Sequence, residues 1–499
     1  MRRWPRAPKL SHSSGPSRLC SSSTTLYTQR RCNSTLGSPL ENAPTGTPNA
    51  EGKPPVDPFA LVAPSLKKLR ASILPLLTSG HPALTELTSY YFLHPSKQIR
   101  PLLVLLFSRA TNGLGSQWET KLWHSQCVGA GGREEELNWP LGRPDVLNDW
   151  NPSMPEGVTG KWESGFVVGQ PVHPRLRPSA TPRPGSTSVP ASSPLPSSMS
   201  SKRVPTLANP PTILPTQIRF AQILEFIHCA SLLHDDVIDA SPLRRGAPSA
   251  PAAFGNKLSV LGAVYILGRT SAMLSRLGDP EVTELTASIT SNLVEGEILQ
   301  MKDVVNGRAG GAARALVGSS SETDPSILPT SPRIRQAWNV YLQKTYLKTA
   351  SLMAKGARSA VILGGCQEGE IYREVAYAYG RNLGIAFQLV DDVLDYASPS
   401  DTLGKPGGAD LQLGLATGPA LFAWEEHPEM GELIGRKFES PGDVELARKL
   451  VHDSSGVQRT RELARAYADK AKEVLLHLPE SEARQALEAL AEKVIGRNA

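Results

Sequence analysis

Two acidic motifs are the part of this 499-residue sequence best suited to chemistry. Each has the pattern Asp-Asp-x-x-Asp at the end of an apolar stretch, and two arginines follow the first. Residues i and i+4 of an α-helix share a face, so the first and last aspartate of each motif are predicted to point the same way. The six aspartates are Asp235, Asp236, Asp239, Asp391, Asp392 and Asp395.

Carboxylates that close apolar helices indicate a site for divalent cations. Unpaired charge beside apolar surface is costly, and a hard cation relieves that cost. Mg²⁺ is usually held by one or two carboxylates together with phosphate groups. Two facing motifs therefore predict two or three Mg²⁺ ions with a diphosphate between them, and Mn²⁺ would suit the same ligands. A single motif is often only a solvated helix end, but its repetition favours the metal site.

The elements that must position these motifs are predicted to be helices. Residues 59–112 and 212–499 carry apolar residues at helical spacing, and no long stretch alternates as a strand would. We therefore expect an all-α domain, a helical bundle around a central cavity. No apolar run approaches the roughly 18–20 residues that span a bilayer, so a soluble or peripheral protein is expected.

Two segments interrupt the helical pattern. Residues 113–211 are rich in Gly, Pro and Ser and are predicted to be a largely disordered insertion, because they cannot bury enough apolar surface to offset their ordering entropy. Residues 307–333 are predicted to be a shorter loop insertion. Several tryptophans fall in the first half of the longer segment, which leaves a small docked patch as an alternative.

The N-terminus differs from the rest of the chain in charge. Residues 1–40 hold six arginines, one lysine and no acid, so without them the net charge falls from +6 to −1. This Arg- and Ser-rich composition is typical of a mitochondrial transit peptide, with residues 41–58 as a linker; a basic tail without targeting function is the alternative. The charge balance gives no case for nucleic-acid binding. The five cysteines form no C-x-x-C pair, so neither a disulfide framework nor a zinc site is indicated.

Several motifs in order closely resemble the trans-polyprenyl diphosphate synthases. These are all-α enzymes of the isoprenoid synthase fold, also called the class I terpenoid synthase fold. The matching segments are `DDVIDASPLRRG`, `NLVEGEILQMKD`, `YLQKTYLKTASLMAKGA` and `GIAFQLVDDVLDYASPSDTLGKPGGADLQLGLATGPALFA`. The resemblance covers 59–112 and 212–499 and is greatest to the mitochondrial long-chain enzymes, hexaprenyl to decaprenyl, of ubiquinone biosynthesis. It implies a prenyltransferase that adds isopentenyl diphosphate to an allylic diphosphate, farnesyl or geranylgeranyl.

The resemblance implies a role for each matching residue. All six aspartates are implied to be catalytic, together with Lys405 at the leaving pyrophosphate. The implied metal ligands are Asp235, Asp239, Asp391 and Asp395. The implied contacts to the allylic substrate are Arg244, Lys348, Thr349 and Gln388. The implied contacts to isopentenyl diphosphate are Lys97, Arg100, His228 and Arg245. A buried structural role is the alternative for His228, and a solvated loop is the alternative for Lys97 and Arg100.

Product length is predicted from the helical turn before the first motif. Ala230 and Ser231 lie there and are small, whereas aromatic residues at these places stop chain growth early in the family. A long product is therefore expected; the alternative is that small residues only allow close helix packing. Two departures from the family pattern stand out: Ser96 replaces the usual glycine, and Val264 stands where an aspartate is expected.

Three other functions remain open on the sequence alone. They are a geranylgeranyl-type short-chain synthase, a non-catalytic subunit of a heteromeric synthase, and a class I terpene cyclase. Both intact aspartate motifs argue against the non-catalytic subunit, and the `RRG` and `KT` segments argue against the cyclase. A homodimer or heteromer is expected from the family. An insoluble product leads us to expect peripheral contact with the inner mitochondrial membrane on its matrix side.

Overall fold

The structure is a computed structural model. It describes residues 56–77, 79, 81–93, 98–127, 132–138, 213–244, 246–301, 331–397 and 409–497. All of these belong to one compact unit, residues 55–499. The predicted transit peptide, most of the linker, residues 139–212 and most of the predicted loop 307–333 lie outside the described residues.

Helices make up nearly all of the described chain, which confirms the predicted all-α class. Strands are confined, among the described residues, to β1 (Leu243–Arg244) and β2 (Ala247–Pro248), a two-residue antiparallel pair just after the first aspartate motif. The helices before it are α1 (Pro58–Leu61), α2 (Ala63–Leu77), α3 (Pro82–Leu93), α4 (Ile99–Thr111), α5 (Trp118–Cys127), α6 (Gly132–Leu137) and α9 (Pro215–Ile238).

The second half of the domain is also helical. Its helices are α10 (Ala250–Phe254), α11 (Asn256–Leu277), α12 (Pro280–Met301), α13 (Pro332–Thr345), the π-helix η4 (Tyr346–Ala350), α14 (Ser351–Leu363), α15 (Ile371–Ala397), α17 (Ala409–Gln412), α18 (Gly418–Glu426), α19 (Met430–Gly435), α20 (Asp443–Asp453), α21 (Gly456–Val474), the 3₁₀ turn η5 (Leu475–His477) and α22 (Glu482–Ile495).

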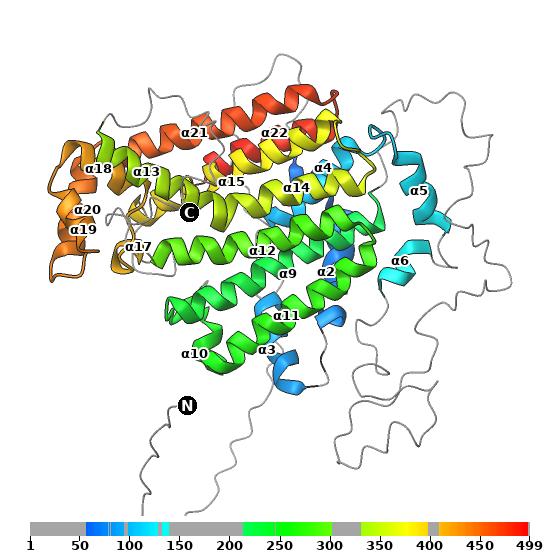
Figure 1. Cartoon of the computed structure of the whole chain (residues 1–499), viewed down its shortest axis with the longest axis horizontal. Helices are drawn as coiled ribbons and strands as arrows, with labels where there is room; N and C mark the ends of the chain where they lie inside the picture. The colour runs from blue at the N-terminus through cyan, green and yellow to red at the C-terminus, as the bar shows by residue number, and fades with distance from the viewer. Residues whose placement is uncertain are drawn as a thin grey trace, which may run out of the picture. The chain divides into compact units, whose positions relative to one another are not determined.

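The long helices lie side by side (Figure 1). Helix α9 packs against α4 and α11, α14 packs against α4 and α15, and α15 packs against α21. The apolar faces that pattern the sequence form the core between them, including Phe107, Phe226 and Tyr379, each fully buried. This arrangement sets α9 and α15, the two helices that end in aspartate motifs, on either side of α14.

Two glycines hold α15 close to the helix before it. A Cβ atom on Gly384 would lie 2.5 Å from the Ala350 Cα atom, and one on Gly380 would lie 2.5 Å from the Met353 carbonyl oxygen. Both distances are shorter than real Cβ contacts, so only glycine fits without a shift of the backbone. The close approach brings the second aspartate motif to the wall formed by η4.

The first part of the predicted insertion packs on the domain. Trp118 at the start of α5 is buried, the Gln117 amide donates to the Gly365 carbonyl oxygen at 3.0 Å, and Lys121 pairs with Asp279 at 3.2 Å. Leu137 of α6 is also buried. The first part of the predicted insertion, helices α5 and α6, is therefore docked on the domain. The structure does not describe residues 139–212, for which disorder stays a prediction.

Among the described helices, α11 alone is long and apolar enough to cross a membrane by length and composition. Its apolar run, residues 258–268, is shorter than the roughly 18–20 residues that span a bilayer, so the sequence predicts no span there. Its buried residues, among them Ala263 and Ile266, face α9 within the helical core.

Candidate active site

Both aspartate motifs border one cavity of about 690 Å³. Its wall comes from the start of α4, the second half of α9, the end of α12, α13 with η4, the end of α15, and the segment from α17 to α18. Asp235 and Asp239 line it from α9, and Asp391 and Asp392 line it from α15. The structure thus brings together two motifs that lie 156 residues apart in the sequence, as the spacing predicted.

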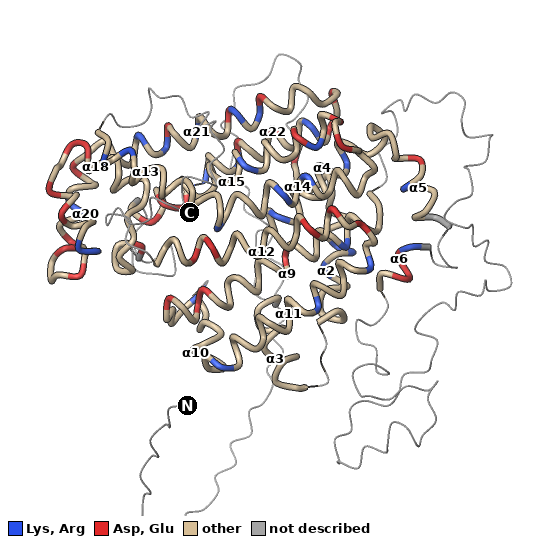
Figure 2. The backbone as a smooth tube through the Cα atoms, in the orientation of Figure 1, with Lys and Arg blue, Asp and Glu red and all other residues tan. Residues whose placement is uncertain are grey.

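The ends of these helices are an unfavourable place for acidic side chains. α9 ends at Ile238, so its aspartates occupy the last turn and the C-cap, where the helix dipole is negative. Figure 2 shows the acidic residues at this end of α9 and along α12. Burial raises the pKa of the Asp235 carboxyl to about 6, against the opposing attraction of Lys348. The cavity therefore concentrates negative charge that a cation would neutralise.

One aspartate of the first motif turns away from the cavity. Asp236 is fully buried, accepts a 2.5 Å hydrogen bond from the Tyr91 hydroxyl and pairs with the Arg244 Nε atom at 2.7 Å. It does not line the cavity, although Arg244 does. Helical spacing explains this, because Asp236 lies about 100° around α9 from Asp235.

The middle aspartate of the second motif, Asp392, is also held by a tyrosine, although unlike Asp236 it lines the cavity. Asp392 is buried and accepts hydrogen bonds from the Tyr341 hydroxyl at 2.5 Å, from Gln388 Nε2 at 2.9 Å and from the Gly418 amide at 3.4 Å. In each motif, therefore, the second aspartate binds a tyrosine from a distant helix. The first aspartate faces the cavity, and the tyrosine fixes the turn of helix that carries it.

The last aspartate of each motif has a different setting. Asp239 lines the cavity, whereas Asp395 is half-buried and accepts a 3.3 Å hydrogen bond from the Asp410 amide. Asp395 does not line the cavity, but Asp410 does. Asp410 could not be predicted from helical spacing, because it lies outside α15, 15 residues after Asp395.

The basic wall of the cavity contains a π-helix. Single π turns are frequent at functional sites, and η4 carries Lys348 and Thr349. Lys348 pairs with Glu297 at 2.5 Å and donates to Gln300 at 3.0 Å, and Thr349 donates to Gln388 at 3.0 Å. Lys348, Thr349 and Gln388 all line the cavity. Their side chains are thus placed opposite the first aspartate motif.

The other end of the cavity is formed by α4 and α9. Arg100 and His228 line it together with the buried Glu225, which sequence reasoning did not single out. Arg497 was missed as well; it pairs with Asp391 at 2.9 Å and stacks over the Phe387 ring. The predicted residues Lys97, Arg245 and Lys405 lie outside the described residues.

The two residues predicted to set product length differ in position. Ser231 lines the cavity and is half-buried, but Ala230 is 1% exposed and belongs to the hydrophobic core. Only Ser231 therefore borders space in which a hydrocarbon chain could lie. Val264, at the departure from the family pattern, is 55% exposed on α11 and does not line the cavity.

The carboxylates suit a divalent cation shared with a phosphate ligand. No three acidic, histidine or cysteine side chains within the described part of the chain converge closely enough to hold an ion by themselves. Asp235, Asp239 and Asp391 instead present oxygens from two sides of one cavity. Mg²⁺ is commonly held by such a sparse set when phosphate oxygens complete its coordination. The ligand types therefore fit a bound divalent metal.

We expect replacement of the two tyrosines that bind buried aspartates to lower the stability of the fold without filling the cavity. Tyr341→Phe removes one of the hydrogen bonds to the buried carboxylate of Asp392 and should lower the free energy of unfolding by about 1.5–3 kcal/mol. Tyr91→Phe should act likewise on Asp236. Urea unfolding measures both effects. Tyr346→Phe is the control, because among the described residues its hydroxyl forms a hydrogen bond only with Tyr377, at 2.7 Å. Equal losses in all three variants would contradict a special role for the carboxylate contacts.

We expect metal affinity to decrease steeply as the pH falls below about 6. The folded-state pKa of Asp235 is raised to about 6 by burial, so its charge destabilises the fold above that pH and protonation removes the penalty as pH falls. A metal ion must displace that proton, so Mn²⁺ affinity should drop by up to about tenfold per pH unit below pH 6. Electron paramagnetic resonance titration of Mn²⁺ in the presence of inorganic pyrophosphate, with the protein-free titration subtracted at each pH, measures this. Equal affinity at pH 5 and pH 7 would contradict it.

Comparisons with known proteins place the chain in a family. Residues 199–451 match the sequence profile of the Polyprenyl synthetase family. The chain is 41% identical to a probable mitochondrial hexaprenyl pyrophosphate synthase of Neurospora crassa, over 93% of this chain and 87% of that protein. It is 48% identical to decaprenyl-diphosphate synthase subunit 1 of Schizosaccharomyces pombe, over 57% of this chain and 69% of that protein.

A solved structure agrees on the fold. The polyprenyl synthase of Caulobacter crescentus, solved with calcium and isoprenyl diphosphate, aligns with a TM-score of 0.58 at 24% identity, over 89% of this chain and 97% of that one. An all-α fold with two facing aspartate motifs defines an isoprenoid synthase. This chain belongs to the polyprenyl synthetase family and is a prenyltransferase. The predicted family and mitochondrial location are confirmed.

Proposed function

We propose that this protein elongates an allylic diphosphate with isopentenyl diphosphate to make a long-chain all-trans polyprenyl diphosphate, the precursor of the ubiquinone side chain. One observation supports this most: residues of both aspartate motifs line the same cavity as Lys348 and Thr349 of η4. Relatives that share 41% and 48% identity carry the names of hexaprenyl and decaprenyl synthases.

We propose that Asp235, Asp239 and Asp391 bind Mg²⁺, with Asp395 or its neighbour Asp410 completing the second side. Bound Mg²⁺ would act as a Lewis acid that stabilises the charge of the leaving diphosphate. The proposed contacts to the allylic diphosphate are Arg244, Lys348, Thr349 and Gln388, joined by Lys405. Asp236 and Asp392 are proposed to position these groups through their hydrogen bonds with Tyr91 and Tyr341. Asp392 also lines the cavity, and the catalytic role that the resemblance implies for both aspartates stays a prediction.

The isopentenyl diphosphate is proposed to lie at the α4 end of the cavity. Arg100 and His228 line this end, and Lys97 and Arg245 are proposed to join them. The cationic side chains hold the two diphosphates so that the isopentenyl double bond faces C1 of the allylic group. Apolar residues such as Leu232 and Phe387 exclude water from the allylic cation.

The reaction conserves atoms and charge in a simple way. The C1–O bond of the allylic diphosphate breaks, and its electron pair leaves with the diphosphate. The electron pair of the isopentenyl double bond then forms the new bond between C4 of isopentenyl diphosphate and C1 of the allylic group. A proton leaves C2 of the isopentenyl unit, where the new double bond forms. The departing diphosphate is proposed to take this proton, since no described side chain of the cavity is an obvious base for it.

The product is proposed to grow past Ser231. A small side chain at the cavity wall leaves room for the lengthening hydrocarbon, which supports a hexaprenyl to decaprenyl product over a geranylgeranyl one. The insoluble product supports peripheral contact with the inner mitochondrial membrane. If product release from the purified enzyme were indifferent to detergent or lipid, this membrane contact would be wrong.

We propose that the enzyme works as a homodimer or as one subunit of a heteromer. Large apolar side chains are exposed on α11 and α12, and exposed apolar patches mark interaction surfaces. They are Val260, Leu261, Val264, Val294, Ile298 and Met301, between 39% and 61% exposed. The S. pombe relative is named as a subunit. Analytical ultracentrifugation tests this: an active dimer supports the homodimer, an inactive monomer the heteromer, and an active monomer contradicts both.

A product assay tests the function. The purified protein, incubated with labelled isopentenyl diphosphate, farnesyl diphosphate and Mg²⁺, should yield a linear product of hexaprenyl length or longer. Chelation of the metal should abolish it. A geranylgeranyl product would support the short-chain alternative, a cyclic product the cyclase, and no product the non-catalytic subunit.

A further inference from the structure

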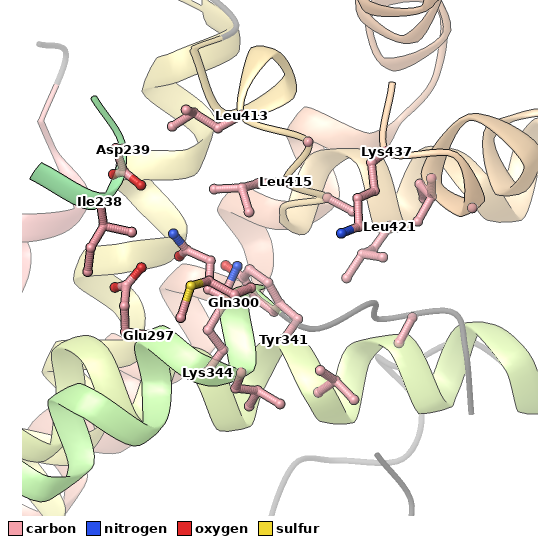
Figure 3. A pocket seen from close by; sticks show the side chains of 18 of the residues that line it. Ile238, Asp239, Glu297, Gln300, Tyr341, Lys344, Leu413, Leu415, Leu421 and Lys437 are labelled. Atoms are coloured by element: carbon pink, nitrogen blue, oxygen red, sulfur yellow. The ribbon is translucent and has the colours of Figure 1, made fainter. Parts of the chain in front are cut away.

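One lysine in the cavity wall has no role in the assignments above. Lys344 lies on α13, four residues before Lys348, and lines the cavity of about 690 Å³. It also lines an adjoining pocket of about 340 Å³ that shares Asp239 and Gln300 with the cavity. Figure 3 shows Lys344 pointing into this pocket, with Asp239 and Glu297 on one side and Lys437 on the other. The lysine thus stands where the two spaces meet.

The neighbours of Lys344 attract it but do not pair with it. Asp392, Asp410 and Glu297 exert an attractive field on its ammonium group, and Lys348 a repulsive one. Glu297 pairs with Lys348, and Asp392 already binds Tyr341 and Gln388. Across the described part of the chain no carboxylate forms a salt bridge with Lys344, whose charge meets only the Tyr341 ring at 5.5 Å.

A desolvated cation of this kind needs an anion to complete its surroundings. Removing an ammonium group from water costs several kcal/mol unless a counter-charge replaces the lost hydration. Burial accordingly lowers the pKa of Lys344. We expect the anion to reach the cavity from solvent, because Glu297 and Asp392 are engaged by other partners. A diphosphate is the anion that the proposed function brings there.

We infer that Lys344 binds the diphosphate of the allylic substrate and stabilises it as the leaving group; this inference rests on the proposed function. Lys344 shares the wall of the smaller pocket with Asp239, a proposed metal ligand, whereas Arg100 and His228 line only the larger cavity. Lys344 therefore belongs to the allylic end. A fixed cation aimed at an oxygen that gains charge as the C1–O bond breaks lowers the barrier to ionisation.

Substitution separates this role from a structural one. Lys344→Gln should lower kcat/KM for farnesyl diphosphate by about 10- to 100-fold, while KM for isopentenyl diphosphate changes by less than about 2-fold, because another set of cations holds that substrate. Lys344→Arg should recover part of the loss. The melting temperature of Lys344→Gln should not fall, since the half-buried charge that is removed forms no salt bridge with the described carboxylates. Lys437→Gln is the matched control, because Lys437 lines only the smaller pocket.

A binding measurement is independent of turnover. Calorimetry with Mg²⁺ and inorganic pyrophosphate should show affinity weakened at least about tenfold in Lys344→Gln and unchanged in Lys437→Gln. Unchanged pyrophosphate affinity, or equal loss toward both substrates, would overturn the inference. A lowered melting temperature that arginine does not restore would show a structural role instead. If a wild-type dimer forms no product at all, the proposed function fails, whereas the pyrophosphate measurement still decides whether Lys344 binds the anion.

Discussion

Asp235→Asn and Asp391→Asn should each reduce prenyl transfer by about 10²–10³-fold, the size of effect seen when one electrostatic stabiliser of a transition state is lost. Asparagine keeps the shape of the side chain but removes the charge that faces the cavity. The half-saturating Mg²⁺ concentration should rise in both variants. Initial rates with labelled isopentenyl diphosphate across a Mg²⁺ titration measure both quantities.

The stability of Asp235→Asn should move opposite to its activity. Burial raises the pKa of Asp235, so its charge destabilises the metal-free fold at neutral pH and its removal should raise the melting temperature. The matched control is Asp236→Asn, which leaves Arg244 without its buried ion-pair partner and should lower the melting temperature. Wild-type activity with unchanged Mg²⁺ dependence in Asp235→Asn would rule out the proposed metal site.

Ser231→Tyr should shorten the product to about geranylgeranyl length. Ser231 lines the cavity one turn before Asp235, so an aromatic ring there fills the space into which the hydrocarbon would grow. The rate of the first condensation should change little, because the diphosphate contacts stay in place. Reversed-phase chromatography of the dephosphorylated products measures the chain length.

The neighbouring position provides the control for product length. Ala230 is buried in the core and does not line the cavity, so Ala230→Val should overpack the core and reduce stability by about 1–3 kcal/mol without shortening the product. If Ser231→Tyr still made the wild-type product, the chain would have to grow along another route. If Ala230→Val shortened it equally, the two positions would share one role.

The direction in which Asp235 and Asp239 point could be predicted, because it depends only on local helix geometry. The spacing of Asp235 and Asp239 on one helix fixes their common direction, whatever the helix packs against. The same spacing pairs Gln388 with Asp392, and the structure shows that hydrogen bond at 2.9 Å. Helical periodicity likewise predicted the all-α class, because each long helix buries one apolar face.

Other parts of the site depend on contacts between distant segments. Tyr91 lies 145 residues from Asp236, and no local pattern announces that its hydroxyl will meet this carboxylate. Arg497 reaches Asp391 from the last described turn of the chain. Adjacent residues on a helix point only about 100° apart. The packing of α9 against its neighbours therefore decides that Ser231 lines the cavity and Ala230 does not, and the sequence alone does not show this packing.

Two acidic helix ends are proposed to share one metal–diphosphate cluster. Anomalous diffraction from crystals grown with Mn²⁺ and a non-hydrolysable allylic thiodiphosphate tests it most directly. Mn²⁺ peaks are expected within coordination distance of Asp235 or Asp239 on one side and of Asp391 on the other, with the thiodiphosphate between them beside Lys348. Mn²⁺ at only one motif, or a thiodiphosphate bound away from both, would contradict it.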